Sequence, residues 1–254
     1  MIKIQCPAKI NLNLKVLGKR EDGFHDIESI MQTINLFDYL TIYAEPWENT
    51  EIVLSGSSSE IPYDERNLVY KAAELFMERT QKTSSINIHI EKNIPVAAGL
   101  AGGSTDAAGT LYGLNELFGN PFSWEELHEM CAQLGSDLNF CLDGGRQLAQ
   151  GRGEILTPLE FEDFFVSLIK PLDLGISAKE AYAGLKPCAG FVNDLEPAIL
   201  DTYPQLQKIK SIYPDVVMSG SGPVFFLLNG RFLPLEGFWY KNHFKAIPYG
   251  IKKA

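Results

Sequence analysis

The chain has 254 residues, of which 45% are hydrophobic and 21% are charged, and its formal net charge at pH 7 is −10. This length and composition are typical of a globular protein with an ample buried core, in one large domain or two small ones. The acidic balance argues against general affinity for nucleic acid, which needs a basic face. It does not argue against a phosphorylated small molecule, which responds to local hydrogen-bond donors more than to net charge.

The sequence predicts a cytoplasmic protein. Its first residues, MIKIQCPAKINLNL, lack the long apolar stretch and the cleavage site of a signal peptide. No apolar run reaches about 18 residues, so we expect no membrane-spanning helix and no membrane partner. The cysteines have no spacing typical of a metal site, and we expect reduced thiols rather than disulfides at Cys6, Cys131, Cys141 and Cys188.

The first half of the chain is predicted to mix strands with helices. Apolar residues alternate over residues 2–16 and 85–92, which is the period of a strand, and residues 28–45 are also strand-like. Residues 67–80 have apolar positions at helical spacing, with Asn67 as the N-cap. Residues 123–134 predict a second helix, which a capping box of Ser123 and Glu126 begins and Gly135 ends.

The pattern starts afresh from about residue 151. It predicts strands over residues 164–171 and 223–230, with helices near 177–185 and 195–203 between them. The glycine-rich residues 143–159 are expected to form turns. Because strands and helices do not alternate strictly, the sequence predicts an α+β protein with two domains, residues 1–150 and 151–254.

Residues 95–109, PVAAGLAGGSTDAAG, are a glycine-rich loop between a strand that ends near Lys92 and a helix that begins near Thr105. A helix start exposes unpaired N–H groups and the positive end of the helix dipole, and glycines let a ligand come close to the backbone. The loop therefore predicts an anion site suited to phosphates. It fits neither the Walker A pattern nor the GxGxxG pattern, and a tight turn with an N-cap is the alternative.

Several stretches together resemble the GHMP kinase family, named for galacto-, homoserine, mevalonate and phosphomevalonate kinases. Residues 95–109 resemble the family's phosphate loop, PxxxGLGGGSSDAA, and MSGSGPVFFLL at 218–228 resembles its C-terminal glycine motif. One branch of the family phosphorylates an alcohol that carries a cytidine diphosphate group. That branch is resembled by PAKINLNLKVLGKREDGFHDIESI at 7–30, GSDLNFCLDGG at 135–145 and FVNDLEPAIL at 191–200.

The resemblance implies both a fold and an activity. The implied fold has an N-terminal domain similar to ribosomal protein S5 domain 2 and a ferredoxin-like C-terminal domain, with the site between them. The implied activity is phosphoryl transfer from ATP with Mg²⁺ to a small-molecule substrate carrying cytidine diphosphate, in the non-mevalonate route to isoprenoids. The residues expected to bind ATP are Pro95, Ala97, Gly99, Leu100, Ala101, Gly102, Gly103, Ser104, Thr105 and Asp106.

The catalytic residues that the resemblance implies are Lys9 and Asp137. Asp137 would accept the proton of the attacking hydroxyl. Lys9 would keep that carboxylate ionised and stabilise the developing alkoxide. From the residues alone, an exposed aspartate in an Asx turn and a lysine reaching out from an edge strand are the alternatives.

The substrate side of the site is implied in the same way. The family match places Phe24 on a face of cytosine, His25 at its polar edge and Tyr182 on the opposite face. The residues expected to contact the substrate are Asn11, Phe24, His25, Asp137, Tyr182, Gly220, Ser221 and Gly222. Asn193 and Asp194 are interpreted either as holding the junction of the two domains or as capping the helix that follows.

The sequence departs from the family pattern at several positions. Phe24 stands where most members have tyrosine, which removes a hydroxyl contact but keeps the stacking surface. Ala178 replaces a threonine, Thr105 a serine, and Asn139 a proline. Ala101 replaces a glycine of the phosphate loop, and its methyl group predicts a negative φ. Residues 232–254 resemble no family motif, and their aromatic side chains are either core or interface.

Two other functions are compatible with the same stretches. One is a GHMP kinase for a different alcohol, against which the Phe24–His25 pair argues. The other is a nucleotide-binding regulator of the same fold without catalysis, against which the presence of both Lys9 and Asp137 argues. An oxidoreductase of the Rossmann type fits poorly, because the glycine spacing is wrong.

Overall fold

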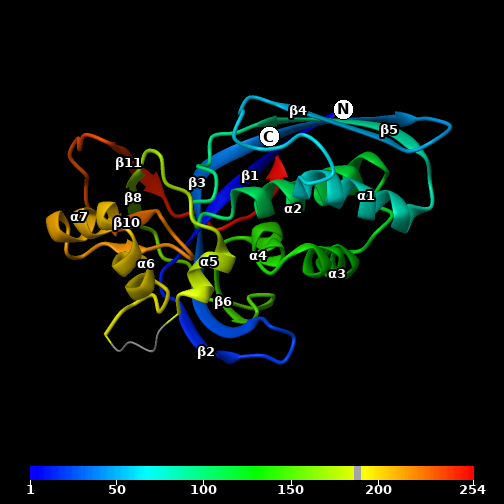
Figure 1. Cartoon of the computed structure of the whole chain (residues 1–254). Helices are drawn as coiled ribbons and strands as arrows, with labels where there is room; N and C mark the ends of the chain where they lie inside the picture. The colour runs from blue at the N-terminus through cyan, green and yellow to red at the C-terminus, as the bar shows by residue number, and fades with distance from the viewer. Residues whose placement is uncertain (186–189) are drawn as a thin grey trace.

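The structure is a computed structural model that describes residues 1–185 and 190–254, and it contains two β-sheets with helices packed on each (Figure 1). In the described residues the larger sheet has eight strands, and its main path runs in the order β12-β1-β3-β5-β4. Pairing along this path is antiparallel except between β4 and β5. The strands of this sheet are β1 (Ile2–Asn11), β2 (Lys15–Lys19), β3 (His25–Pro46), β4 (Glu51–Gly56), β5 (Ser84–Glu91), β6 (Arg146–Gly151), β7 (Ile155–Pro158) and β12 (Lys252–Lys253).

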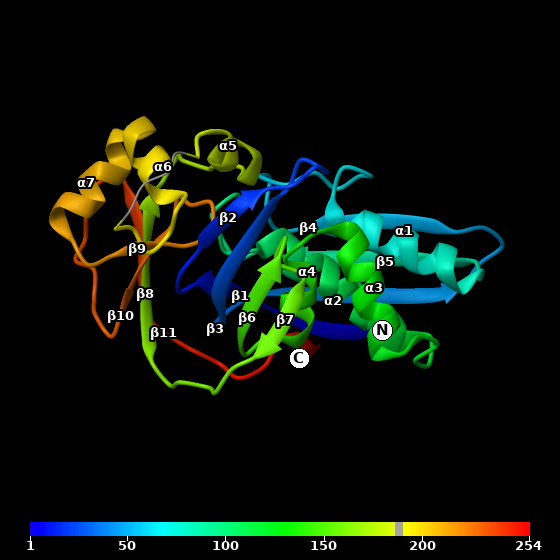
Figure 2. The same ribbon diagram turned by 90° about the horizontal axis from the view of Figure 1, so that it is seen from below.

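Strand β3 is the longest element, with 22 residues, and it serves two regions of the sheet. Its residues 31–46 pair with β1 and β5, whereas its residues 25–32 pair with β2 and β6. Figure 2 shows β2, β6 and β7 gathered around the start of β3. The prediction that residues 143–159 form only turns is wrong, because β6 and β7 make an antiparallel hairpin there.

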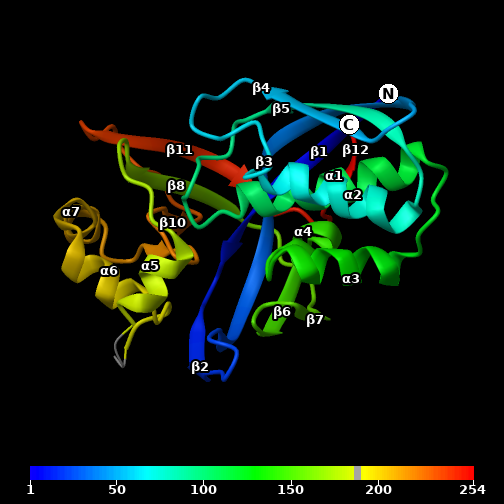
Figure 3. The ribbon, with the colours of Figure 1, turned by 45° about the vertical axis from the view of Figure 1, so that its right-hand side comes forward.

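Within the part of the chain that the structure describes, four helices accompany the larger sheet: α1 (Leu68–Thr80), α2 (Gly102–Leu117), α3 (Trp124–Leu134) and α4 (Leu138–Asp143). In Figures 1 and 3, α1 and α2 lie along one face of this sheet. Helix α2 comes close to the strands because it presents glycines to them. A Cβ at Gly109 would lie 2.5 Å from Cys6 Sγ, and one at Gly113 would lie 2.6 Å from Ile42 Cδ1. This close packing fixes where the first turn of α2 lies.

The helix boundaries agree in part with the predictions. Asn67 accepts a hydrogen bond from Val69 N–H as the N-cap of α1, and the capping box of Ser123 and Glu126 is present, so both predictions are confirmed. Helix α2 begins at Gly102, before the predicted Thr105. Gly135 follows α3 as expected, but with extended backbone at φ 171° rather than in the left-handed conformation of a C′ glycine.

The smaller sheet is antiparallel and runs in the order β11-β8-β10-β9. Its strands are β8 (Phe165–Pro171), β9 (Val217–Met218), β10 (Phe225–Leu228) and β11 (Phe238–Lys245), and its helices are α5 (Ala178–Ala183), α6 (Glu196–Thr202) and α7 (Pro204–Ile212). Phe225 packs with residues of the helices, while its neighbour Phe226 packs with Ala8 and Ile10 of the larger sheet. One face of the smaller sheet thus faces its helices and the other joins the larger sheet.

The C-terminal residues return to the beginning of the chain. Strand β12 pairs with β1, with Ile4 opposite Lys253, and the two termini lie close together in Figure 1. All residues between β10 and β11 are described, and they contain no helix. This order differs from the βαββαβ order of a ferredoxin-like domain, which has a helix before its last strand. Partly buried Trp239 and Phe244 pack between the sheets, and Tyr240 packs toward the helices, so these aromatic residues of the C-terminal stretch contribute to the cores.

Two further predictions concern single features of the chain. Cys6, Cys131 and Cys141 are free and buried, and Cys188 lies outside the described residues. In the described ranges, no helix has the length and apolar character needed to span a bilayer. The division at residue 150 stays a prediction, since β6 crosses this position and both β7 and β12 join the larger sheet.

Candidate active site

Strand β1 brings Lys9 and Asn11 to the junction of the two sheets. Side chains alternate along a strand, so Ala8 and Ile10 enter the core while Lys9 and Asn11 share the other face. Lys9 Nζ donates to Asn11 Oδ1 at 2.6 Å, and Lys9 N–H bonds to Leu100 O at 3.1 Å, in the glycine-rich loop. Asn11 Nδ2 donates to Ser29 Oγ at 2.8 Å, which fixes the orientation of its amide. The ammonium group is thereby held against the loop.

Asp137 stands opposite Lys9, at the N-cap position of α4. Its Oδ2 lies 3.4 Å from Lys9 Nζ, and the Asp137 side chain keeps 31% exposure while that of Lys9 keeps 5%. The Asp137 side chain makes no capping hydrogen bond to α4. The structure therefore does not support the alternative of a purely local role in a turn. The pair therefore combines a buried cation with a carboxylate that remains open to a ligand.

The glycine-rich loop lies directly before α2. Gly99 has φ +75°, and a Cβ there would lie 2.0 Å from Ser219 O, so only glycine fits. Ala101 has φ 59°, which contradicts the prediction that its methyl group imposes a negative φ. The surrounding contacts hold Ala101 in this left-handed conformation, including a hydrogen bond from Thr105 N–H to Ala101 O at 2.9 Å. The amides of Gly102, Gly103 and Ser104 precede this first bond of the helix and are the donors that an anion would use.

The C-terminal glycine motif contacts both strand β1 and the glycine-rich loop. Ser219 Oγ donates to Gly99 O at 3.0 Å and accepts from Asn11 N–H at 3.3 Å. A Cβ at Gly220 would lie 3.1 Å from Asn11 Oδ1 and 3.2 Å from Lys9 Nζ. Residues from β1, the loop and the segment before β10 thus meet at one point.

Asn193 and Asp194 bond to the segments that surround this point. Buried Asn193 donates through Nδ2 to Met218 O and to Gly220 O, both at 2.8 Å, and accepts from Leu195 N–H at 2.9 Å. Asp194 accepts from Val16 N–H at 2.9 Å and pairs with Lys15. Asn193 therefore lies at the junction, whereas the alternative of a helix cap is wrong, because the N-cap residue of α6 is Leu195 and it makes no side-chain capping hydrogen bond.

The aromatic residues lie at the mouth of the site, where the β2–β3 hairpin meets α5. The His25 and Tyr182 rings are stacked, with centroids 4.9 Å apart and planes 19° apart. Phe24 is 50% exposed, and the Arg152 guanidinium carbon lies 5.0 Å from its ring centroid. Burial, reinforced by the charge of Asp137, raises the pKa of Tyr182 to about 12, so this phenol keeps its proton and can donate a hydrogen bond at neutral pH.

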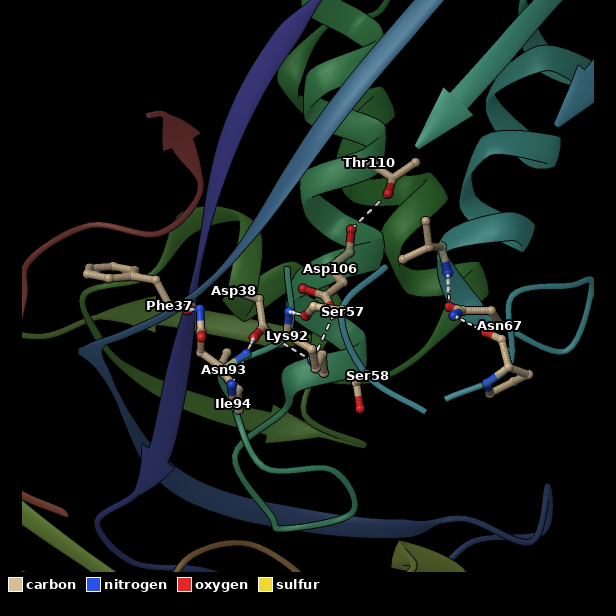
Figure 4. A network of polar contacts seen from close by, with 12 residues as sticks. Phe37, Asp38, Ser57, Ser58, Asn67, Lys92, Asn93, Ile94, Asp106 and Thr110 are labelled. Atoms are coloured by element: carbon tan, nitrogen blue, oxygen red, sulfur yellow. Dashed lines mark hydrogen bonds and ion pairs between the residues drawn. The ribbon is translucent and has the colours of Figure 1, made fainter. Parts of the chain in front are cut away.

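A buried charge cluster supports the loop from the side of the larger sheet (Figure 4). Lys92, directly after β5, pairs with Asp38 of β3 and donates to Asp106 Oδ2 of α2 at 2.9 Å. All three side chains are at most 5% exposed. A Cβ at Gly102 would lie 2.8 Å from Lys92 Nζ, so the loop and the lysine are in close contact.

Many of these residues line one cavity of about 880 Å³. It brings together most of the predicted site residues, namely Lys9, Asn11, Phe24, His25, Pro95, Ala97, Gly99, Ala101, Gly102, Gly103, Ser104, Asp106, Asp137, Tyr182, Gly220 and Ser221. Leu100 and Thr105 are buried behind the loop rather than in the wall of the cavity, and Gly222 is also outside the wall.

Several lining residues were not predicted. Lys92 and Arg152 add positive charge, and Ile61, Leu68 and Val96 give one part of the cavity an apolar wall. The position of Lys92 could have indicated its role, because Lys92 lies between the strand and the glycine-rich loop and the loop must pack against that strand. No pattern in the sequence pointed to Arg152, which reaches the site because β6 pairs with the start of β3.

A glycine-rich helix start opposite a lysine–carboxylate pair is the arrangement that the resemblance to the GHMP kinases implied. Residues 67–145 match the family model described as GHMP kinases N terminal domain. A crystal structure of 4-(cytidine 5'-diphospho)-2C-methyl-D-erythritol kinase superimposes with a TM-score of 0.77, at 27% identity, over 96% of this chain and 99% of that one.

Two relatives place the chain more narrowly. A 4-diphosphocytidyl-2-C-methyl-D-erythritol kinase of Lachnoclostridium phytofermentans is 38% identical over 98% of this chain and 94% of its own length. One from a Synechococcus species is 46% identical over 78% of this chain, and the match spans 64% of that relative. The chain therefore belongs to the GHMP kinase family, in the branch formed by these 4-diphosphocytidyl-2-C-methyl-D-erythritol kinases.

Proposed function

We propose that the protein transfers the γ-phosphoryl group of ATP to the 2-hydroxyl of 4-diphosphocytidyl-2-C-methyl-D-erythritol, in the non-mevalonate route to isoprenoid precursors. The observation that carries this proposal is the Lys9–Asp137 pair, 3.4 Å apart, in the same cavity as the glycine-rich start of α2. The family and the relatives support the choice of substrate.

ATP would bind with its phosphates at the first turn of α2. The amides of Gly102, Gly103 and Ser104 supply donors, and the helix dipole favours negative charge there. The apolar wall of Ile61, Leu68 and Val96 is suited to the flat, apolar faces of a nucleobase.

Mg²⁺ fits this cavity as an ion carried by the nucleotide. The described parts of the chain contain no group of three His, Cys, Asp or Glu side chains that would cage a metal. Mg²⁺ binds readily through substrate phosphates while keeping several waters, so the ATP phosphates themselves would hold it. When bound, the ion neutralises charge on the phosphates.

The transfer itself uses Asp137 and Lys9. The hydroxyl oxygen bonds to the γ-phosphorus, the bond from that phosphorus to the β–γ bridging oxygen breaks, and ADP leaves. The hydroxyl proton passes to a carboxylate oxygen of Asp137. Lys9, held by Asn11 at 2.6 Å, stays beside this carboxylate and stabilises negative charge on the attacking oxygen.

The cytidine end of the substrate would occupy the aromatic mouth of the cavity. Phe24 offers an exposed ring face, and His25 and Tyr182 supply polar atoms and a second aromatic surface. The His25 ring covers part of Tyr182, so a base that stacks on Tyr182 would displace or slide along the His25 ring.

Replacement of the proposed base tests this function. Asp137→Asn keeps the size of the side chain but cannot accept the proton, so kcat should fall by on the order of 10²–10⁴ with nucleotide affinity nearly unchanged. Steady-state ADP release and MgADP titration measure the two quantities. Asp173→Asn, an exposed position outside the cavity wall, is the control and should leave both values unchanged. A kcat within about twofold of wild type in Asp137→Asn would remove Asp137 as the base.

A further inference from the structure

Two carboxylates share one ammonium group beneath the phosphate loop. Lys92 Nζ lies between Asp38 and Asp106, as Figure 4 shows. The three side chains come from β3, the end of β5 and α2, and they are almost completely buried. With all three ionised, the cluster carries one net negative charge, at the wall of a cavity that would receive a polyanion.

The two carboxylates are not equivalent in their hydrogen bonds. Asp38 Oδ1 accepts from Asn93 N–H at 2.5 Å and from Ile94 N–H at 2.8 Å, and its Oδ2 pairs with Lys92. Both oxygens of Asp38 are therefore occupied by donors.

Asp106 has an open position for a proton. Its Oδ2 accepts from Lys92 at 2.9 Å, whereas its Oδ1 is buried and, among the described residues, has no hydrogen-bond partner. An ionised oxygen without a donor is costly in a buried site, and a protonated one is less so. Thr110 does not fill the gap, because its hydroxyl donates to the backbone oxygen of Asp106.

Among the described residues, the thiol of Cys6, on β1, is a further titratable group close enough to interact with Asp106. Burial, together with the charges of Asp106 and Asp38, raises the pKa of this thiol far above its usual range, so Cys6 stays neutral. Cys6 therefore adds no charge to the cluster of Lys92, Asp38 and Asp106.

We propose that Asp106 is a proton-linked positioning residue for the nucleotide: it is the neutral acid, with its proton on Oδ1, when phosphates occupy the loop, and nucleotide uptake above neutral pH draws a proton into the cluster. The proposal rests on the proposed binding of ATP at this loop. With the proton in place, Lys92 and Asp38 form a neutral ion pair behind the phosphates and Asp106 adds no negative charge.

The cluster is poised for this uptake. Burial, joined by the nearby charge of Asp38, raises the pKa of Asp106 to about 7, although Lys92 opposes the shift. A phosphate bound at the start of α2 adds negative charge nearby and raises this pKa further. Between these two pKa values, binding and protonation of Asp106 favour each other.

The first test measures protons in the wild-type protein. MgADP is titrated calorimetrically at pH 8 in two buffers of different ionisation enthalpy, a pH at which the nucleotide itself is fully ionised. We expect uptake approaching one proton per nucleotide bound. Uptake near zero, with MgADP bound and ATP turnover intact, would overturn the role of Asp106 while leaving the kinase function in place. Absence of MgADP binding and of turnover would overturn both.

The second test assigns the proton to Asp106. An asparagine at this position would resemble the neutral acid, so Asp106→Asn should bind MgADP without the proton uptake. Its affinity relative to wild type should rise by about tenfold or more between pH 7 and pH 9, because one pKa unit corresponds to a tenfold change. The ratio of the two affinities cancels effects of pH on the nucleotide. Asp173→Asn, at an exposed position outside the cavity wall, keeps the cluster intact and should show no such gain. A folded Asp106→Asn protein with weaker binding at every pH would contradict the proposal.

Discussion

Lys9 and its neighbour Ala8 are adjacent on β1, yet one faces the cavity and the other the core. The alternation of side chains along a strand accounts for this difference, and it also places Asn11 on the same face as Lys9. The partner of Lys9 was not predictable from spacing alone, because Asp137 comes from a distant segment of the chain. For single residues, the sequence therefore predicts which face of a strand a side chain occupies. Which residues pair with each other is known only from the fold or from a family resemblance.

Phe24 provides a test at this scale. Phe24→Ala removes an exposed ring at the mouth of the cavity, and stacking of a base on an aromatic side chain contributes about 1–3 kcal/mol. We expect the KM for the cytidyl substrate to rise about tenfold with the KM for ATP unchanged. Steady-state kinetics with each substrate varied in turn measure both values. Phe161→Ala, at an exposed position outside the cavity wall, is the control. An unchanged KM for the cytidyl substrate would remove the stacking role.

At the scale of elements, the loop and helix α2 form the central unit of the site. The position of the helix was predicted closely because the glycines, the small residues and the following apolar run all indicate a helix start. The conformation of Ala101 was predicted wrongly, since contacts with the rest of the loop outweigh the preference of a methyl group for negative φ. The β6–β7 hairpin was missed because glycines there suggest turns, whereas pairing with β3 determines the structure.

Gly103 tests the function of this unit without disturbing its fold. A Cβ at Gly103 would have no atom within 4 Å, although the residue lines the cavity. Gly103→Val should therefore fold with a Tm close to wild type while losing nucleotide binding, because the side chain occupies the path of the phosphates. Thermal melting and MgADP titration measure the two properties.

A second glycine gives the matched control. Gly18 also has open space at the position of a Cβ and lies outside the cavity wall, so Gly18→Val should bind nucleotide normally. If Gly103→Val bound MgADP as wild type does, the loop would serve only as a turn and a helix cap.

At the scale of the whole molecule, the site exists because two sheets are held together. The cluster that joins them combines Ala8, Ile10 and Ile34 of the larger sheet with Val166, Leu168 and Phe226 of the smaller one. Periodicity predicted strands over the segments that contain these residues, but not which sheet each strand would join. The return of β12 to β1 was likewise unpredictable, because a two-residue strand has no sequence signal.

Asn193 links the joined sheets to the site, because its amide bonds to the backbone oxygens of Met218 and Gly220. Replacing it is the test at this scale. Asn193→Ala leaves Met218 O, Gly220 O and Leu195 N–H without their buried partner. Each unpaired buried group costs about 1–3 kcal/mol, so we expect a clear fall in Tm. We also expect kcat/KM to fall at least about tenfold, measured at a temperature where the variant is folded, because misplacement by about 1 Å can cost that much.

The exposed Asn87, on β5, gives the comparison, and Asn87→Ala should change neither quantity. A folded Asn193→Ala protein with normal kinetics would mean that the segment at 218–220 keeps its place without this amide.

The most direct test of the central claim is ADP release from MgATP with 4-diphosphocytidyl-2-C-methyl-D-erythritol, measured beside mevalonate, homoserine and galactose. We predict turnover with the cytidyl substrate alone, because the aromatic mouth of the cavity selects for the base while the Lys9–Asp137 pair acts on the hydroxyl. Turnover with another alcohol of the panel and none with the cytidyl substrate would contradict the account, as would nucleotide binding without turnover of any of them.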